Sequence, residues 1–156
     1  MMADRWNIPL ILQRMLEVLL VVSPVIIIAV PFIFAYFDPE FVNTYIAGDA
    51  QNKWATLTFI EICSVCCWLI LLFLQKLLKT VNISSPFVYK NVLYLKYISY
   101  ICAFMAFVLI VKTFMDFSVM TPVVAILGLL SSLFCQTLAA VFDKAIKLKD
   151  ENDLTI

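Results

Sequence analysis

The side chains of this chain that could do chemistry lie inside apolar segments. Glu61 is set in the run TFIEICSVCCWLILLFL, residues 58–74, and three cysteines, Cys63, Cys66 and Cys67, follow it closely. If this run crosses a bilayer, an ionised carboxyl group within it costs about 2.5–3.5 kcal/mol on insertion scales. Such a carboxyl group should therefore turn inward and meet a partner, or it should mark a functional site.

Two further charged residues fall at a matching depth. Glu61 is seven residues after Trp54, a candidate interface anchor, which places it roughly 10 Å inside the outer surface. Lys112 lies one to two turns inside the outer end of a later apolar segment, and Asp116 follows four residues on, along the same helical face. The matched depths predict an intramembrane charge cluster of Glu61, Lys112 and Asp116. Two interpretations stay open: the cluster fixes helix register, or Glu61 is a proton- or cation-binding carboxylate of a transporter.

The cysteines favour packing over redox chemistry. Cys63 and Cys66 form a C-x-x-C pattern of the kind that thiol oxidoreductases use. A membrane thiol oxidase also needs a second, exposed pair, and all five cysteines lie in apolar runs. The chain has no histidine, and the other usual ligands are missing, so we expect neither a metal site nor a cofactor. With no hydrolase, kinase or phosphate-binding signature either, we expect a protein that is not an enzyme.

The composition identifies the solvent around these residues. The chain is 64% hydrophobic and 14% charged, with a mean hydropathy of +1.02, whereas soluble domains are about 45–50% apolar and about 25% charged. Its formal net charge is zero, which gives no argument for direct nucleic-acid binding. We therefore predict a single integral membrane domain over residues 1–156.

Four apolar stretches are long enough to cross a hydrocarbon core, which takes about 20 residues. Backbone amides in lipid must be satisfied within each segment, so we predict an all-α fold, a bundle of four transmembrane helices. With two glycines in the chain, alanine, serine and cysteine must serve where these helices approach closely. The predicted spans are residues 16–37, 54–75, 95–117 and 121–142.

Basic residues predict the orientation. Nine of the eleven would share one side, and only Lys53 and Lys112 would lie on the other. Because cytoplasmic loops are enriched in lysine and arginine, both termini should be cytoplasmic, N-in and C-in. The nine are Arg5, Arg14, Lys76, Lys79, Lys90, Lys96, Lys144, Lys147 and Lys149.

The segment ends carry local signals. Pro24 and Pro31 should kink the first span, either as a hinge or as a static bend. Before it, IPLILQRMLE reads as a short interfacial helix or as the start of the same helix. Ser85 and Pro86 suit an N-cap and a first helical position, so the third helix should begin in the cytosol. The fourth helix should run on into the cytosol as VFDKAIKLKDEN.

The cytoplasmic tail, residues 143–156, ends on apolar side chains. After a charged stretch come Leu154, Thr155 and Ile156. This ending predicts docking, either onto the protein's own cytoplasmic loop or into a partner by strand addition.

Two stretches carry a resemblance to a known family. SPFVYKNVLYLKYISY and, near the end, VFDKAIKLKDENDLTI resemble a family of small four-span bacterial membrane proteins, the domain of unknown function 2975. Its members are similar to products of two-gene units whose second gene encodes a small Cro/CI-type helix-turn-helix regulator. The resemblance implies a multi-pass protein of the bacterial inner membrane, a DNA-binding protein as its cytosolic partner, and no catalytic residues.

Three functions are then open. The chain could be a regulatory or sensory partner of that regulator, a small proton- or ion-coupled transporter that uses Glu61, or an immunity or stress protein of the membrane. The cytoplasmic lysines could bind the regulator, or they could meet anionic lipid at about 1 kcal/mol each. Formation of a homo-oligomer also stays open.

Overall fold

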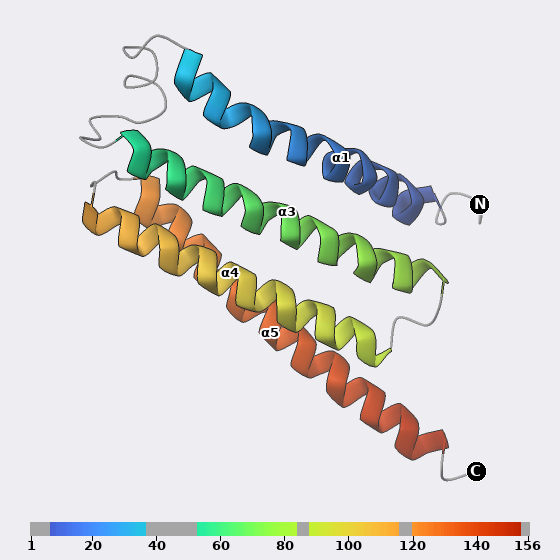
Figure 1. Ribbon diagram of the computed structural model, residues 1–156. Coiled ribbons are helices and arrows are strands. Elements are labelled where there is room, and N and C mark those ends of the chain that lie inside the picture. Colours follow the sequence, from blue (N-terminus) through green and yellow to red (C-terminus); the bar gives the residue numbers. More distant parts are fainter. Residues whose placement is uncertain (1–6, 37–52, 84–87, 116–119, 154–156) are drawn as a thin grey trace.

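The computed structural model describes residues 7–36, 53–83, 88–115 and 120–153, and these residues form helices with no strand among them. The helices are α1 (Asn7–Tyr36), α3 (Lys53–Ile83), α4 (Tyr89–Met115) and α5 (Met120–Asp153). The predicted all-helical fold is confirmed (Figure 1).

Each of these helices contains a stretch long and apolar enough to cross a membrane. The stretches are Ile11–Ile33, Ala55–Val81, Tyr89–Met115 and Met120–Asn152. Large hydrophobic side chains are exposed along them, as on Val21, Phe107 and Phe134. Exposure of this kind suits lipid, which surrounds apolar side chains without cost. The chain is a multi-pass transmembrane protein.

Neighbouring helices in the sequence are neighbours in space. α1 packs on α3, α3 on α4 and α4 on α5, and the α4–α5 contact is the most extensive. The helices alternate in direction. The start of α1, the end of α3, the start of α4 and the end of α5 therefore lie at one end of the molecule (Figure 1).

Small side chains let α4 and α5 approach closely. Ala106, Ala125 and Ala139 are buried between these helices, and Ser99 is hydrogen-bonded to Ser132 across them. Small residues have this role in membrane helix pairs because burying large apolar side chains gains little against lipid. The expected use of alanine, serine and cysteine at close contacts agrees with this seam.

The first helix is the least enclosed of the four. Among its described side chains only Leu16 is buried, with 5% of its surface exposed. The helix is continuous from Asn7 through both Pro24 and Pro31. The segment IPLILQRMLE is therefore the start of α1, and it is not a separate interfacial helix.

A small cluster joins three helices near the end that carries seven of the nine lysines. Val92, Leu95 and Ala139 form its buried centre. Its partly buried contacts come from α3 and α5 and are Leu77, Leu138, Phe142 and Ile146. The cluster holds the C-terminal half of α5 against α4 and α3. The helix turns that bear the lysines at this end are therefore fixed relative to one another by packing.

Candidate functional site

Glu61 lies on an open apolar groove between α3 and α4. The groove has a volume of about 590 Å³, and α4 contributes Tyr100, Ile101 and Phe104 to its lining. The side chain is half-buried, and its Oε1 atom is buried with no hydrogen-bond partner among the described residues. A carboxyl oxygen in this position is held in apolar surroundings without compensation.

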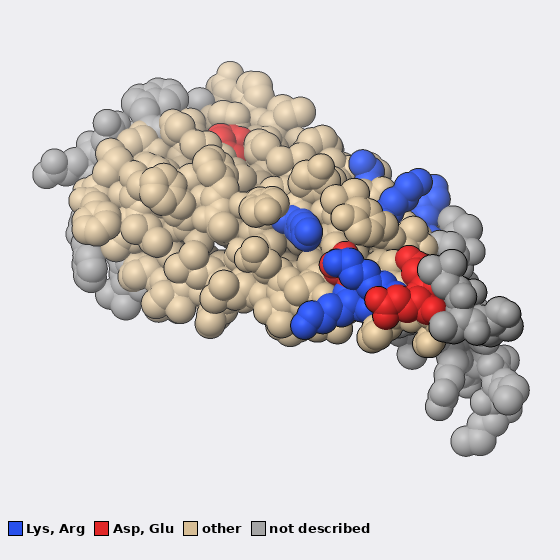
Figure 2. Space-filling model, turned by 90° about the horizontal axis from the view of Figure 1, so that it is seen from below, with Lys and Arg blue, Asp and Glu red and all other residues tan. Residues whose placement is uncertain are grey.

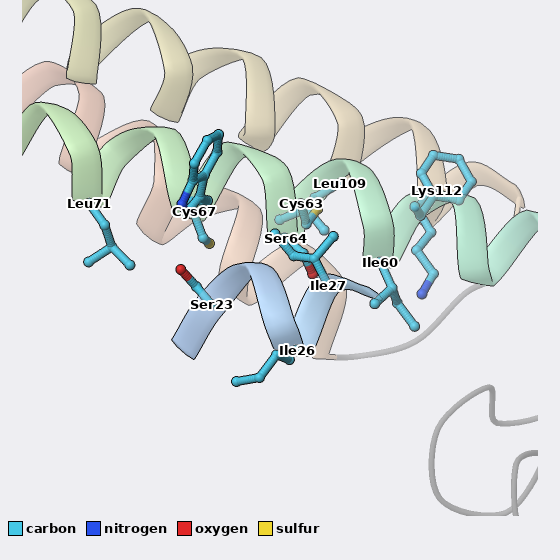
Figure 3. A pocket seen from close by; sticks show the side chains of 12 residues that line it. Ser23, Ile26, Ile27, Ile60, Cys63, Ser64, Cys67, Leu71, Leu109 and Lys112 are labelled. Atoms are coloured by element: carbon cyan, nitrogen blue, oxygen red, sulfur yellow. The ribbon is translucent and has the colours of Figure 1, made fainter. Parts of the chain in front are cut away.

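Lys112 lies on a different space, a cavity of about 390 Å³ between α1, α3 and α4. Figure 3 shows Lys112 at one end of this cavity and Leu71 at the other, with Cys63 and Ile27 between them. Most of the lining is aliphatic or aromatic. Among the lining residues, all of which belong to the described part of the chain, Lys112 is the one with a charged side chain.

The structure forms no ion pair between Glu61 and Lys112. Among the described residues, ion pairs join Arg14 to Glu17 and Asp143 to Lys147. Glu61 shares its groove with Cys66, whereas Lys112 shares its cavity with Cys63. Glu61 and Cys63 are two residues apart on α3, a rotation of about 200° around the helix axis. The two charged side chains therefore meet different faces of α3.

The third member of the predicted charge cluster, Asp116, lies outside the described residues. The cluster as a whole therefore stays a prediction, without a Glu61–Lys112 pair in this structure.

Three of the cysteines line these spaces: Cys63 and Cys67 line the Lys112 cavity, and Cys66 lines the Glu61 groove. Cys66 and Cys102 are buried, with 5% and 6% of their surfaces exposed, and all five cysteines are free thiols. Within the described part of the chain, no group of three or more histidine, cysteine, aspartate or glutamate side chains could hold a metal ion.

The lysines predicted to face the cytosol are brought together. They come from the last turns of α3, the first turns of α4 and the C-terminal part of α5, and all are exposed. Figure 2 shows basic and acidic side chains gathered toward one end of the molecule, and the wide region beyond them is tan except for one acidic patch. We call this set the basic end: Lys76, Lys79, Lys90, Lys96, Lys144, Lys147 and Lys149.

Local contacts orient two of these lysines. Lys147 Nζ lies 2.9 Å from Asp143 Oδ2, one helical turn away. Lys76 Nζ lies 5.5 Å from the centroid of the Phe73 ring, which is stacked on the Tyr97 ring at 5.3 Å. The remaining five lysines have no ion pair among the described residues, so their ammonium groups are open to a partner or to lipid, although the exposed carboxylates of Asp150 and Glu151 share the last turns of α5 with them.

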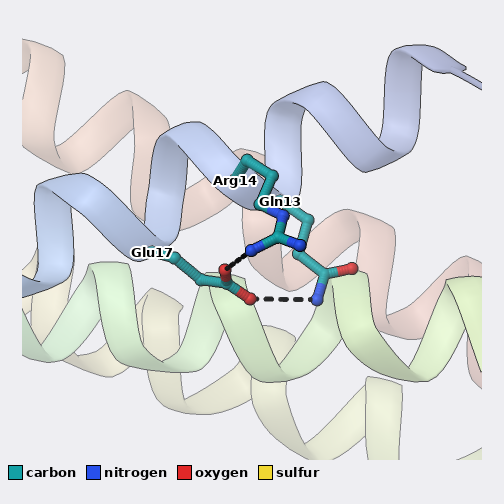
Figure 4. Close-up of polar contacts among 3 residues, drawn as sticks. All are labelled: Gln13, Arg14 and Glu17. Carbon is teal, nitrogen blue, oxygen red and sulfur yellow. Dashed lines mark hydrogen bonds and ion pairs between the residues drawn. The ribbon is translucent and has the colours of Figure 1, made fainter.

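The start of α1 carries a balanced charge group. Arg14 lies 3.6 Å from Glu17, and Gln13 Nε2 donates a hydrogen bond to Glu17 Oε1 at 3.2 Å (Figure 4). An exposed pair of this kind adds at most about 1 kcal/mol to stability. Because Arg14 is paired within its own helix and the lysines of α5 are balanced by acidic residues of the same helix, the net positive charge at this end comes from α3 and α4.

Two sets of predicted residues remain to be placed. Pro24 and Pro31 lie within α1; Pro24 follows Ser23 inside the stretch that lines the Lys112 cavity, and Pro31 lies four residues beyond Ile27. Leu154, Thr155 and Ile156, which are predicted to dock, lie outside the described residues, as do Ser85 and Pro86.

Sequence reasoning missed the cavity itself. Its α3 wall consists of residues spaced by one, three or four, which is one helical face. That spacing was present in the sequence, but lipid-facing and cavity-facing positions carry the same apolar residue types. The wall is Phe59, Ile60, Cys63, Ser64, Cys67, Trp68 and Leu71.

The family described as protein of unknown function (DUF2975) matches residues 40–156. The chain belongs to this family. The match covers α3, α4 and α5 of this DUF2975 chain and begins after α1. It confirms the resemblance that the segments at residues 85–100 and 141–156 carried. Neither the curated proteins nor the solved structures contain a match.

Proposed function

We propose that this DUF2975 chain is a non-enzymatic protein of the bacterial inner membrane that binds a small cytosolic helix-turn-helix regulator at its basic end. The observation that carries this proposal is the basic end itself. Seven exposed lysines from three helices are gathered over a packed apolar cluster. Acidic residues of α5, among them Asp150 and Glu151, are interspersed with these lysines (Figure 2), and a surface with charges in a fixed pattern is suited to steer and orient a soluble partner of complementary charge.

The proposed topology has both termini in the cytosol. The lysines of the basic end stay on the cytosolic side because translocating basic residues is disfavoured. α5 has 34 residues, which at 1.5 Å per residue is about 51 Å, against about 30 Å for the hydrocarbon core. Its last turns, with Lys144, Lys147 and Lys149, then extend into the cytosol, and the start of α4 extends beside them.

The length of α5 argues for a protein partner beyond lipid contact. Lysines near the headgroups, such as Lys96, can meet anionic lipid at about 1 kcal/mol each. Lys149 lies seven residues after Phe142, the end of the predicted span, and about 10 Å further along the helix axis, which places it outside the hydrocarbon core. The identity of the partner follows from the family resemblance, which implies a helix-turn-helix regulator encoded beside this protein.

Localisation of that regulator tests the proposal. A fluorescent regulator should lie at the membrane with the wild-type protein and become cytosolic with the triple variant K144Q/K147Q/K149Q. The matched control is Lys53→Gln at the opposite end of the bundle, which should leave the regulator at the membrane. Membrane levels of each variant are measured in parallel. A regulator that is cytosolic in the presence of the wild-type protein contradicts the proposal.

One observation favours a second function, an ion-coupled carrier. The Oε1 atom of Glu61 is buried without a hydrogen-bond partner among the described residues, on a groove that opens at the protein surface. A carboxylate in that position can take up a proton or a small cation. In proteoliposomes, proton-coupled transport that Glu61→Gln abolishes would support the carrier. An unchanged proton flux with and without the protein would contradict it.

A further inference from the structure

We infer that the cavity between α1, α3 and α4 binds an acidic membrane lipid, with its anionic headgroup at Lys112 and one acyl chain along α3. This binding site is separate from the basic end, and it does not depend on the function proposed above.

The first support is the shape of the cavity. Its α3 wall runs from Phe59 to Leu71, a rise of about 18 Å. One leaflet of a hydrocarbon core is about 15 Å thick, half of about 30 Å. The cavity therefore has about the length of one acyl chain. Its volume of about 390 Å³ is within the range of small-molecule sites, about 300–1,000 Å³.

The second support is the polarity of the cavity wall. Its α1 side is formed by Ser23, Ile26 and Ile27, and Ser23 Oγ already donates a hydrogen bond to Leu20 O at 3.4 Å. Most of the remaining side chains that face the cavity are aliphatic, aromatic or thiol groups. An acyl chain can fill this space without leaving a polar group of its own buried and unpaired.

The third support is the position and sign of the charge. Lys112 lies three residues before the end of α4 at Met115, about 4.5 Å along the axis. A lysine ammonium at that depth reaches the headgroup level while its stem lies along apolar surface. No carboxylate lines the cavity, and in the described part of the chain none lies within ion-pair distance of Lys112. An anionic headgroup would supply an opposite charge that the described residues do not place at Lys112.

The groove that holds Glu61 provides an internal comparison. It is apolar and larger, about 590 Å³ against about 390 Å³, but its one charged side chain is a carboxylate. An anionic headgroup should be repelled there, so the preference for an acidic lipid should be confined to the Lys112 cavity.

Quenching of tryptophan fluorescence by brominated lipid tests the inference. Trp68 lines the inner part of the cavity. An acyl chain offers no hydrogen-bond acceptor to Trp68 Nε1, so we assign the indole no role in binding. It serves only as the fluorescent probe. The chain contains two other tryptophans, Trp6 and Trp54, and both are replaced by phenylalanine. The protein is held in a neutral detergent and titrated with phosphatidylglycerol or phosphatidylcholine that carries brominated acyl chains.

Phosphatidylglycerol should quench Trp68 at a mole fraction about fivefold lower than phosphatidylcholine, which corresponds to about 1 kcal/mol for one charge. Lys112→Gln should remove the preference, and Lys112→Arg should keep it. Lys79→Gln, at the basic end, is the matched control and should leave the preference unchanged. Equal quenching by the two lipids, or a preference that persists in Lys112→Gln, overturns the inference.

Two further titrations distinguish the cavity from the Glu61 groove and a lipid from a soluble anion. The first uses a protein in which Trp68→Phe removes the cavity probe and Phe104→Trp places a tryptophan in the Glu61 groove. Quenching of this tryptophan should show no preference for phosphatidylglycerol over phosphatidylcholine. A preference as large as that of Trp68 overturns the assignment of the lipid site to the Lys112 cavity. Excess glycerol phosphate should leave the quenching of Trp68 unchanged. If it competes, the cavity recognises a soluble anion and the lipid assignment is overturned.

Circular dichroism and size-exclusion profiles identify any variant that fails to fold. The Lys112→Arg and Lys112→Gln proteins are compared only where the profiles of both match those of the parent protein.

Discussion

Ser99 of α4 and Ser132 of α5 each donate a hydrogen bond to the other's backbone carbonyl. Both distances are 2.9 Å, and the two hydroxyl oxygens lie 3.0 Å apart. Each hydroxyl has one proton, so both bonds can form at once. Both side chains are buried, with 2% and 7% of their surfaces exposed. A one-residue slip of either helix would break both bonds, so the pair fixes the register of the α4–α5 seam.

Removing these hydroxyl groups should loosen the seam by a predictable amount. We expect Ser99→Ala or Ser132→Ala to lower the free energy of unfolding by about 0.6 kcal/mol, the average for hydrogen bonds between membrane helices, and by at most about 1.7 kcal/mol. The double variant should lose about twice as much, because each alanine leaves the other serine's bond intact. Unfolding in detergent by steric trapping or sodium dodecyl sulfate titration measures these values.

The matched control for this prediction is Ser131→Ala. Ser131 is exposed, and its hydroxyl donates to Leu127 O of its own helix at 2.8 Å. It contributes nothing between helices, so its loss should change the unfolding free energy by much less. Equal losses at Ser131 and Ser132 would show that the seam does not rely on the serine pair.

Gly128 is a second point of close approach in the same seam. A Cβ atom added there would lie 3.2 Å from Ala106 Cβ and 3.6 Å from Cys102 O. We expect Gly128→Ala to cost about 1 kcal/mol and Gly128→Leu to cost more, since overpacking typically costs about 1–3 kcal/mol. Ala106→Gly should recover part of the loss in the Gly128→Ala background, because it removes the nearest atom.

Lipid-facing substitution provides the control for the glycine variants. Ala140 is exposed on α5, so Ala140→Leu should leave the unfolding free energy nearly unchanged. The same unfolding titration measures all four proteins. If Ala106→Gly fails to recover any stability in Gly128→Ala, the assigned contact is wrong.

The sequence specified these contacts only in part. Small residues recur at spacings of three and four in both helices, as in Gly128 and Ser132 of α5 and in Ser99, Cys102 and Ala106 of α4. That spacing marks a face that can pack closely. Hydropathy does not indicate which helix meets that face, because lipid and a neighbouring helix are equally apolar. The four spans could therefore be predicted, whereas the Ser99–Ser132 register could not.

The charged residues show the same limit. The depth of Glu61 and Lys112 follows from counting residues along each helix, but the direction each side chain faces follows from how the helices rotate and pack. Matched depth predicted an ion pair, whereas in the structure Glu61 lines the groove between α3 and α4 and Lys112 lines the cavity between α1, α3 and α4. By contrast, the lysines of the basic end lie at helix ends, where the alternating direction of the helices alone brings them together.

Replacing Glu61 tests whether its carboxyl group has a partner in the folded protein. A buried polar group without a hydrogen bond costs about 1–3 kcal/mol by mutational data. We therefore expect Glu61→Leu to raise the unfolding free energy, and Glu61→Gln to change it little. Thermal unfolding in detergent is the measurement. A loss of stability in both variants would show that Glu61 pairs with a cation, and it would restore the predicted cluster with Lys112 and Asp116.

The proposed topology predicts the side from which single cysteines can be labelled. In a background with all five cysteines replaced by alanine, Lys79→Cys and Lys147→Cys should react with an impermeant maleimide in inverted vesicles and stay protected in intact spheroplasts. Lys53→Cys should show the reverse pattern. The expectation rests on the alternating direction of the helices (Figure 1) and on retention of lysine-rich segments in the cytosol. Because the ends of α3 and α5 lie on one side of the molecule, labelling of residues 79 and 147 from opposite sides would contradict the fold. Labelling of both from outside would instead keep the fold and invert the protein, which would leave the basic end without a cytosolic partner.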